Sequence, residues 1–482
     1  MGLVRNVAKN SLAMAGVQIV AQISTLILAM VLSRSLGADY ATYTSAFSVA
    51  TVLFLIADFG LGFQMVVEVA PNRSIAPQFL TNTLVLRALL GTVAMGLTLA
   101  MVLMDGLPAT VSYAYLIIAV STAFSWIAQT FQSMFNAFER MYYILMTSLV
   151  ERAFTVSISI ALVLLGYGLE LVVLVVLVGS ILNVCLAYLV CSRLVVRPSR
   201  VVNLGKIKAQ LKDALTYAVN SALVSSLYAL NGFLLLTIVW GTRGIEAGEL
   251  ANAQFYIAFN LVVSLIAIPT VFKTALLPVI SRLYSSSRDL ARLTQQKTMK
   301  YMFALGLPIT VGGIILADKI IMLFFPNYPA SAGVFQVLIP VIAISFFGTG
   351  VGSVLASAKM MRYNTVSASL GAGLNILLCF ALIPYMEAQG AALAFTLATL
   401  TTNMVSYYYL TRKAFAVDAV DIIVRPVLAA GGMAAVLLLM PGADFIVSLG
   451  VGAAVYFVLL FAVKAIDQED AEILKKVMKK GA

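Results

Sequence analysis

Apolar runs of about twenty residues recur along the whole of this 482-residue chain, and no other feature restricts its fold as strongly. About twenty residues is the length of helix that crosses the roughly 30 Å hydrocarbon core of a membrane. Hydrophobic residues make up 62% of the sequence and charged residues only 11%, so the chain lacks the charge that covers an ordinary water-facing surface. The sequence therefore predicts an all-α polytopic membrane protein.

Charged residues, glycines and prolines divide the chain into about fourteen expected transmembrane spans. We interpret the first as a retained helix and not a signal peptide, because its apolar run is too long and no small-residue cleavage site follows. The expected spans are 11–33, 41–65, 78–104, 110–137, 143–165, 169–191, 213–239, 252–280, 301–324, 333–357, 363–384, 389–410, 420–440 and 444–463.

Lysine and arginine are distributed unevenly between the two sets of loops that these spans create. The loops on the side of the N-terminus hold most basic residues, whereas the opposite loops keep only Arg34, Arg243 and Lys319. Because basic loops stay in the cytoplasm, we expect both termini to be cytoplasmic and the protein to lie in the plasma (inner) membrane of the cell. The net charge of +11 then reflects topology and attraction to anionic membrane lipids, not nucleic-acid binding.

Residue patterns typical of enzymes and metal sites are missing from the sequence. The chain contains no histidine, which removes the commonest metal ligand and any histidine-based triad. It has no Walker A, H-E-x-x-H or G-x-S-x-G sequence, and Cys185, Cys191 and Cys379 form no CxxC pair. We therefore predict no enzymatic activity, no catalytic residue, no metal site and no cofactor.

The longest polar stretch, 192–212, separates six spans from eight. Because six is even, both halves start on the same side, and a repeat would be parallel. A weak match between Phe138–Tyr143 and Ala358–Tyr363, each after the fourth span of its half, agrees with a duplication. The expected domains are an N-terminal lobe at 1–200, a C-terminal lobe at 201–413, two extra helices at 414–466 and a basic cytoplasmic tail at 467–482.

Three basic residues, Arg87, Arg152 and Lys273, lie inside predicted spans, where a charge costs at least about 2.5–3.5 kcal/mol. One interpretation is a cationic cavity, open to the cytoplasm, that binds an anionic headgroup such as a diphosphate. The alternatives are internal ion pairs, of Arg87 with Asp58 and of Arg152 with Glu151, or snorkelling of the long side chains to the interface. The two acidic residues are expected as counter-ions, and a role in coupling to H⁺ or Na⁺ stays open.

Polar uncharged side chains mark the helix faces that are expected to line a cavity. Gln18 and Gln22 share one face of the first span, Gln129 and Asn136 lie along the fourth, and Asn220 lies on the seventh. Polar groups that face lipid are costly, so these faces point inward. There they either line a hydrated path or join helices by hydrogen bonds.

Several segments resemble motifs of polysaccharide-export flippases, in the same order and at the same spans. Leu32–Tyr40 resembles the family's L-x-R-x-L-G-x-x-x-(Y/F) turn after the first span, and Ala57–Gly62 its D-x-G-(L/F) end of the second. Phe131–Met141 resembles the Q-x-x-x-x-(G/A)-x-x-R-(M/F) end of the fourth. Further similar segments are Leu277–Tyr284, Phe325–Ala332 and Asn375–Ala392, the last with Glu387 where the family often has glycine nearby.

This resemblance is to the O-antigen-type flippase family of the multidrug/oligosaccharidyl-lipid/polysaccharide exporter superfamily. It implies two pseudo-symmetric six-helix lobes around a central cavity, plus two C-terminal helices. It also implies a polyprenyl-diphosphate-linked oligosaccharide as the substrate, moved from the inner to the outer leaflet by alternating access for cell-surface glycan assembly. Arg87, Arg152 and Lys273 become the expected substrate-binding residues, and glycan polymerases or glycosyltransferases the expected partners.

Three other functions remain compatible with the sequence. A multidrug or metabolite exporter of the same fold would be expected to have acidic and aromatic residues in its cavity, because its substrates are commonly cationic. A lipid II flippase would also carry an anionic lipid, but the segments around Arg34 and Arg140 resemble that group less closely. A membrane scaffold without transport would pair all of its buried charges.

Overall fold

The computed structural model describes residues 2–58, 60–199 and 204–463, and every regular element in these ranges is a helix. Ten of the described helices are long and apolar enough to cross a membrane. Large apolar side chains such as Leu377 and Leu428 are 69% and 62% exposed, as expected for a shell that faces lipid. The chain is thus an all-helical, multi-pass membrane protein.

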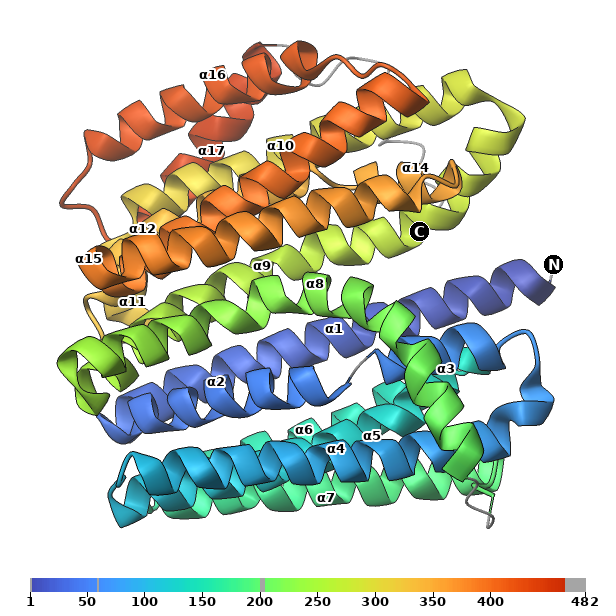
Figure 1. The fold of residues 1–482 in the computed structure, drawn as a ribbon. Coiled ribbons are helices and arrows are strands. Elements are labelled where there is room, and N and C mark those ends of the chain that lie inside the picture. Colours follow the sequence, from blue (N-terminus) through green and yellow to red (C-terminus); the bar gives the residue numbers. More distant parts are fainter. Residues whose placement is uncertain (1, 59, 200–203, 464–482) are drawn as a thin grey trace.

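The long helices that precede α8 lie roughly parallel in the lower part of Figure 1, coloured blue to green. We call α1–α7 the first lobe. Its elements are α1 (Gly2–Ser35), α2 (Asp39–Asp58), α3 (Leu61–Val69), the short 3₁₀ helix η1 (Arg73–Ile75), α4 (Ala76–Met104), α5 (Ala109–Ala137), α6 (Tyr142–Leu164) and α7 (Leu169–Leu194). Each expected span of this half falls on one of these α-helices, except that the second covers both α2 and α3.

Most of the remaining helices form the upper part of Figure 1, and the start of α8 reaches down beside α3 and α4. We call α8–α15 the second lobe, against which α16 and α17 pack. These elements are α8 (Leu204–Arg243), α9 (Ile245–Ser286), α10 (Arg288–Ile315), α11 (Ala317–Phe324), α12 (Ser331–Leu338), α13 (Pro340–Phe347), α14 (Val351–Ser357), α15 (Met361–Tyr409), the π-helical η2 (Leu410–Ala414), α16 (Ala419–Leu438) and α17 (Phe445–Ala462). The expected tail at 467–482 lies outside the described residues.

The two lobes are joined mainly by α1 and α2, which pack against α8 and α9 along the middle of Figure 1. One continuous apolar core crosses this junction and contains Leu28, Tyr40, Phe255 and Phe395. A second core holds α16 and α17 against α10, where the hydroxyl of Tyr456 donates to the carbonyl oxygen of Ala304 at 2.7 Å. The junction between the lobes is therefore packed through α1, α2, α8 and α9.

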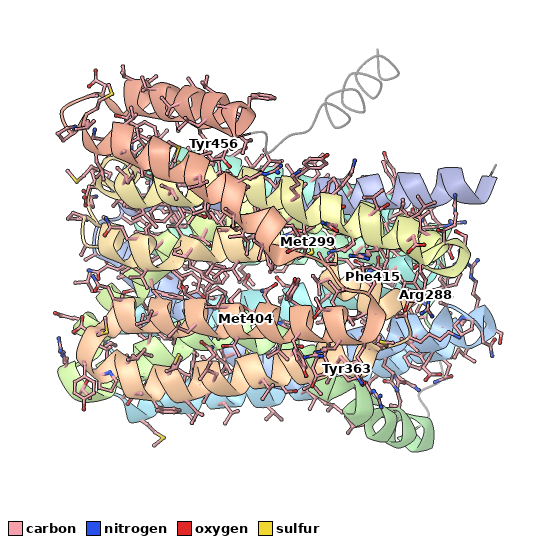
Figure 2. The ribbon with its side chains drawn as sticks, turned by 90° about the horizontal axis from the view of Figure 1, so that it is seen from above. Arg288, Met299, Tyr363, Met404, Phe415 and Tyr456 are labelled. Carbon is pink, nitrogen blue, oxygen red and sulfur yellow. The ribbon has the colours of Figure 1, made fainter. Side chains whose placement is uncertain are left out.

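The connections α9–α10, α14–α15 and η2–α16 meet at one end of the molecule. Figure 2 shows Arg288, Tyr363 and Phe415, which lie at these three connections, toward the same end of the bundle. Two expected spans separate each of these connections from the next, so the expected spans place all three on the same side. These three connections, with the basic residues Arg288 and Arg412 beside them, thus lie at one end of the molecule.

The turns that end α5 and α14 have the same backbone geometry. Glu139 and Lys359 both adopt left-handed conformations, with φ of 59° and 58°. In each turn the following amide donates to the carbonyl oxygen five residues earlier, at 2.8 Å in both cases. The weak sequence match 220 positions apart is therefore also a match in structure.

The kink in α15 falls at Glu387, between two of the expected spans. Its φ of 46° and ψ of −122° are non-helical, and a side chain in this region costs of the order of 1–3 kcal/mol. The carboxylate of Glu387 forms an ion pair with Arg243 at the end of α8. This exposed pair contributes only about 0–1 kcal/mol, so it does not repay the backbone strain.

Replacing Glu387 with glycine is expected to stabilise the protein by about 1 kcal/mol, because glycine relieves the strain at this backbone conformation. Thermal unfolding of the detergent-solubilised protein measures the change. The matched control is Glu387→Gln, which breaks the ion pair but keeps the strain, and it should alter stability by less than about 1 kcal/mol. A glycine variant less stable than the glutamine variant would contradict this account of the kink.

Candidate functional site

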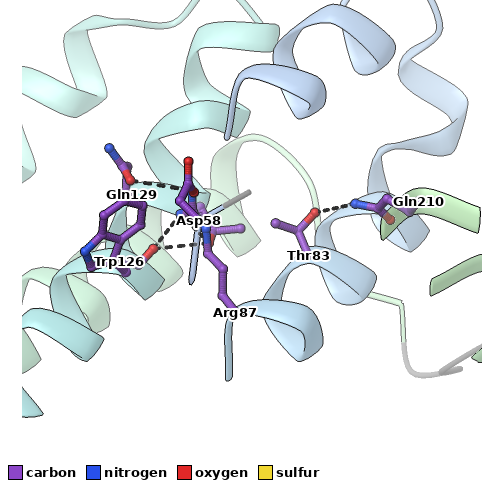
Figure 3. A network of polar contacts seen from close by, with 7 residues as sticks. Asp58, Thr83, Arg87, Trp126, Gln129 and Gln210 are labelled. Atoms are coloured by element: carbon purple, nitrogen blue, oxygen red, sulfur yellow. Dashed lines mark hydrogen bonds and ion pairs between the residues drawn. The ribbon is translucent and has the colours of Figure 1, made fainter. Parts of the chain in front are cut away.

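Arg87 on α4 is bonded through both of its Nη atoms inside the first lobe (Figure 3), whereas its buried Nε has no hydrogen-bond partner. Its Nη2 lies 2.5 Å from Oδ1 of Asp58, the last residue of α2. Its Nη1 donates to the carbonyl oxygen of Trp126 at 2.6 Å and to the hydroxyl of Thr130 at 3.0 Å. The Arg87 side chain is only 2% exposed. The Arg87–Asp58 ion pair, which was one of the alternatives from the sequence, is therefore present in the structure.

This ion pair lies where the helical backbone is interrupted between α2 and α3. After Asp58 the chain turns at Gly60, whose φ of 71° suits glycine, and helix α3 begins at Leu61. Arg87 therefore links the end of α2 to α4 and to α5. Its Nη2 also approaches Oε1 of Gln129 at 3.5 Å, so the pair reaches the back of a polar pocket.

The start of α8 adds a second polar contact to the same region. Nε2 of Gln210 donates to the hydroxyl of Thr83 at 2.8 Å (Figure 3), and Nε2 of Gln64 donates to the backbone carbonyl of Gln210 at 3.2 Å. The first turns of α8 thus pack against α3 and α4 of the first lobe. Sequence reasoning missed these residues, because no helix periodicity indicates which lobe α8 touches.

A polar pocket of about 390 Å³ lies between α1, α5, α6 and α7; we call it the first-lobe pocket. Arg152 and Gln129 both line it, as does Glu151. Helix α1 contributes apolar side chains, and Gln18 and Gln22 are not among the lining residues. The pocket is lined by Val17, Val20, Ala21, Ser125, Trp126, Gln129, Gln132, Ser148, Glu151, Arg152 and Asn183.

Charge in the first-lobe pocket is balanced, and hydrogen-bonding capacity is left over. Nε of Arg152 lies 3.4 Å from Oε2 of Glu151, and Nη1 approaches the hydroxyl of Thr25 at 3.4 Å. Oδ1 of Asn183, a residue 9% exposed, is buried without a hydrogen-bond partner, and so is Oδ1 of Asn136. Buried amide oxygens normally have a donor, so Asn183 offers an acceptor to a hydroxyl group in the pocket.

A second polar pocket, of about 300 Å³, lies between α9, α13 and α15; we call it the Lys273 pocket. Lys273 projects an exposed side chain into it, and no carboxylate is among the described residues that line it. Hydroxyl and amide groups surround the ammonium group. The lining consists of Ile266, Pro269, Thr270, Lys273, Ser345, Gly348, Thr349, Ala368, Phe395, Thr399, Thr402 and Asn403.

An apolar pocket of about 340 Å³ adjoins the Lys273 pocket and shares Asn403 with it. It lies between α10, α13, α15 and α16, and Met404, labelled in Figure 2, is on its wall. Aromatic rings of Phe347 and Tyr407, whose centroids are 5.5 Å apart, form another part of the wall. The remaining lining residues are Phe303, Ala343, Ile344, Leu400 and Ile423.

The three basic residues named from the sequence thus occupy three different settings. Arg152 lines the first-lobe pocket, and Lys273 lines a pocket in the other lobe. Arg87 lies behind the first-lobe pocket, where its contacts with Trp126 and Gln129 position two of the lining residues. The side chain of Asn220 lies outside the described residues.

The lobes are sealed together at the end that carries the α1–α2 turn. Nδ2 of Asn327 donates to the carbonyl oxygens of Ser33 and Arg34, at 3.0 Å each, and the hydroxyl of Tyr328 donates to that of Gly37 at 2.7 Å. Burial raises the pKa of Tyr328 to about 12, so its phenol remains a neutral donor. Arg34 donates to backbone carbonyls at the end of α11.

Comparison with protein families gives one match. A family model described as "Polysaccharide biosynthesis protein" matches residues 7–284, which extend from α1 almost to the end of α9. No curated protein matches the chain in sequence.

Comparison with solved structures gives matches over nearly the whole chain. A structure of the lipid II flippase MurJ in an inward closed conformation is similar with a TM-score of 0.75 and 14% identity, covering 95% of this chain and 99% of that one. The Vibrio cholerae MATE transporter VcmN matches with a TM-score of 0.56 and 11% identity, over 84% of this chain and 96% of its own. A MOP superfamily transporter from Pyrococcus furiosus matches with a TM-score of 0.57 and 12% identity, over 84% of this chain and 94% of its own. These similarities establish the fold.

Proposed function

The chain belongs to the polysaccharide biosynthesis protein family, and from this membership we propose that it is a flippase for a polyprenyl-diphosphate-linked oligosaccharide. It is a membrane transporter with the fold of the MOP superfamily. In the proposed reaction the headgroup passes from the inner to the outer leaflet by alternating access. A diphosphate and many sugar hydroxyls cannot cross hydrocarbon without a polar route.

The Lys273 pocket is the observation that carries this proposal. An ammonium group without a carboxylate among its described neighbours in the pocket is an unsatisfied positive charge, and such a charge inside a membrane protein favours an anionic ligand. The hydroxyl of Thr399 and the amide of Asn403 line the same pocket and supply further donors. In our proposal Lys273 binds the diphosphate.

The first-lobe pocket is better suited to sugar than to phosphate. Its single cation, Arg152, is accompanied by Glu151, whereas Gln129, Gln132 and Asn183 offer amide donors and acceptors. Amides and hydroxyls match the hydroxyl groups of a glycan. We assign this pocket to the first sugar residues, and the apolar pocket beside Lys273 to the isoprenoid units that adjoin the diphosphate.

The proposal includes a membrane arrangement. The two lobes, at 1–200 and 201–413, rock against each other, the helices at 414–466 are an addition to the second lobe, and about fourteen spans place both termini in the cytoplasm of a plasma membrane. The paired turns at Glu139 and Lys359 support the duplication. In this arrangement the contacts of Asn327 and Tyr328 with the α1–α2 turn lie at the outer end and hold it closed.

A multidrug exporter of the same fold is disfavoured by the charges of the first-lobe pocket and the Lys273 pocket. A site for organic cations needs a carboxylate that is not neutralised. In the first-lobe pocket Glu151 has Arg152 beside it, and in the Lys273 pocket the sign is reversed. A lipid II flippase differs from our proposal only in the headgroup, because lipid II is itself a diphosphate-linked saccharide.

The proposed function is tested in the host cell by removing the protein. We expect the outer-leaflet pool of glycan-linked lipid to fall while the inner-leaflet pool rises, as measured by a membrane-impermeant glycan-modifying enzyme before and after lysis. An unchanged distribution would overturn the proposal.

Variants of the Arg152–Glu151 pair test whether Arg152 binds the substrate in addition to pairing with Glu151. We expect Arg152→Gln to weaken binding of a polyprenyl-diphosphate-linked disaccharide about tenfold, the effect of roughly one lost charge-assisted hydrogen bond. Glu151→Gln should strengthen it, because the arginine is released from its pair. Quenching of Trp126, which lines the pocket, measures binding in a Trp240→Phe background. Equal effects of both variants would indicate a purely structural pair.

A further inference from the structure

Glu249, on the second turn of α9, is buried between the two lobes. Only 7% of this residue is exposed. Its Oε2 accepts from the hydroxyl of Thr42 on α2 at 2.7 Å, and its Oε1 accepts from the hydroxyl of Tyr115 on α5 at 3.0 Å. Both donors belong to the first lobe, so the carboxyl group of the second lobe is bonded entirely across the junction.

A neighbouring amide extends this contact one turn further along α9. Asn252 is fully buried and bonds the hydroxyls of Ser45 and Ser48 on α2, at 3.1–3.2 Å. Together Glu249 and Asn252 with Thr42, Ser45 and Ser48 form a polar zipper between α2 and α9. We call these residues, with Tyr115, the outer gate.

The charged groups around Glu249 are acidic. Asp39 on α2 and Glu246 on its own helix act on it electrostatically, and Asp105 after α4 acts on Tyr115. The two arginines at this end are engaged elsewhere: Arg243 pairs with Glu387, and Arg34 donates to carbonyls of α11. Glu249 therefore has hydroxyl donors but no cation among its described hydrogen-bond and ion-pair partners.

We propose that Glu249 is a proton-binding site that latches the outer gate: the gate is closed when Glu249 carries a proton and opens when the proton is lost. An ionised carboxylate without a cation is strongly disfavoured in a buried site, whereas the neutral acid keeps hydrogen bonds to both hydroxyls. Opening separates α2 from α9, and water then hydrates the carboxylate of Glu249. The inference goes beyond the proposed function, and it rests on the proposed orientation and on alternating access.

The structure also offers the proton a route to the outside. Thr42 lines a pocket of about 390 Å³ together with Asp39 and Glu170, at the end of the molecule that carries the α4–α5 and α6–α7 turns. On opening, the O–H bond of Glu249 breaks, its electron pair stays on the carboxylate, and the proton passes to water in this pocket. Closure reverses the step. With one proton per opening, the ratio of open to closed gates changes by up to tenfold per pH unit.

Cysteine accessibility tests this latch on the full-length protein. Cys185, Cys191 and Cys379 are replaced by serine, and Ala41, buried in the core beside the gate, is replaced by cysteine. Right-side-out vesicles are treated with a membrane-impermeant thiol reagent at external pH values from 5 to 9. Ala109→Cys, at the exposed first residue of α5, corrects for the reagent's own pH response. Labelling of this control from outside also verifies the orientation independently of any substrate.

We expect labelling of Ala41→Cys, relative to the control, to rise with external pH when Glu249 is present. In the Glu249→Gln variant, which mimics the protonated acid, labelling should stay low and lose its pH dependence. If that variant fails to reach the membrane, Tyr115→Phe provides the second test: loss of one of the hydrogen bonds that hold the neutral acid in the closed gate should move the midpoint of the labelling curve to lower pH. An unchanged pH profile in either variant, or labelling that falls with pH, would overturn the proposal.

Discussion

Reversing the charge of Lys273 is expected to abolish translocation of the lipid-linked saccharide. Lys273→Gln should lower the transport rate about 10- to 100-fold, because each lost charge-assisted hydrogen bond costs about 1.5–3 kcal/mol and about 1.4 kcal/mol corresponds to a factor of ten. Lys273→Glu should lower the rate further, because it adds repulsion between the carboxylate and the diphosphate. Transport by reconstituted vesicles measures both effects.

Two matched variants separate loss of substrate contact from loss of charge in general. Lys273→Arg keeps the positive charge in the pocket and should retain most of the activity. Lys413→Gln, at an exposed position in η2, removes a lysine remote from the pocket lining and should leave transport unchanged. A transport rate of Lys273→Glu equal to that of the wild type would show that Lys273 does not contact the substrate.

Breaking the Arg87–Asp58 pair is expected to cause the largest loss of stability. Removing one partner of a buried ion pair leaves an uncompensated charge, which costs about 3–5 kcal/mol. Arg87→Ala and Asp58→Ala should each show this loss in the thermal unfolding of the detergent-solubilised protein. The double variant Asp58→Asn/Arg87→Gln should lose much less than the sum of the single changes, because no charge is left behind.

The exposed Arg243–Glu387 pair supplies the control for this prediction. Its side chains are 54% and 33% exposed, compared with 2% and 11% for Arg87 and Asp58. Removing Arg243 should therefore change stability by less than about 1 kcal/mol. A loss of the same size at both pairs would show that Arg87 is not a buried structural link.

The helices were largely predictable, because hydrophobicity and length act locally along the chain. The expected spans fall on helical segments of the described residues, ten of which are long and apolar enough to cross a membrane, and the limits of α4 to α7 agree with the expected ones to within about three residues. The breaks were harder to foresee. The second span ends early at Asp58 because an ion pair to α4 and the turn at Gly60 interrupt it, and the tenth is divided at Ile339 and again at Gly348–Gly350.

The candidate site was predictable only in its residue types. Burial of charge within spans selected Arg87, Arg152 and Lys273, but depth along a helix does not tell which neighbours a side chain meets. Arg87 faces Asp58 and Trp126 because of how α2, α4 and α5 pack, and no sequence period encodes that packing. Glu249 was missed because it precedes the expected span 252–280, in a loop where a charge is ordinary, although packing between the lobes buries it.

The most direct test of the proposed function is a translocation assay with purified protein. Liposomes are prepared with a fluorescent polyprenyl-diphosphate-linked disaccharide in both leaflets, and a membrane-impermeant glycosidase is added outside. Vesicles without protein should expose only the outer-leaflet half of the lipid. We predict that the wild-type protein exposes the inner-leaflet half as well and that Lys273→Glu does not. Cleavage that stops at the outer-leaflet half with active, correctly inserted protein would contradict the assignment as a flippase of diphosphate-linked glycans.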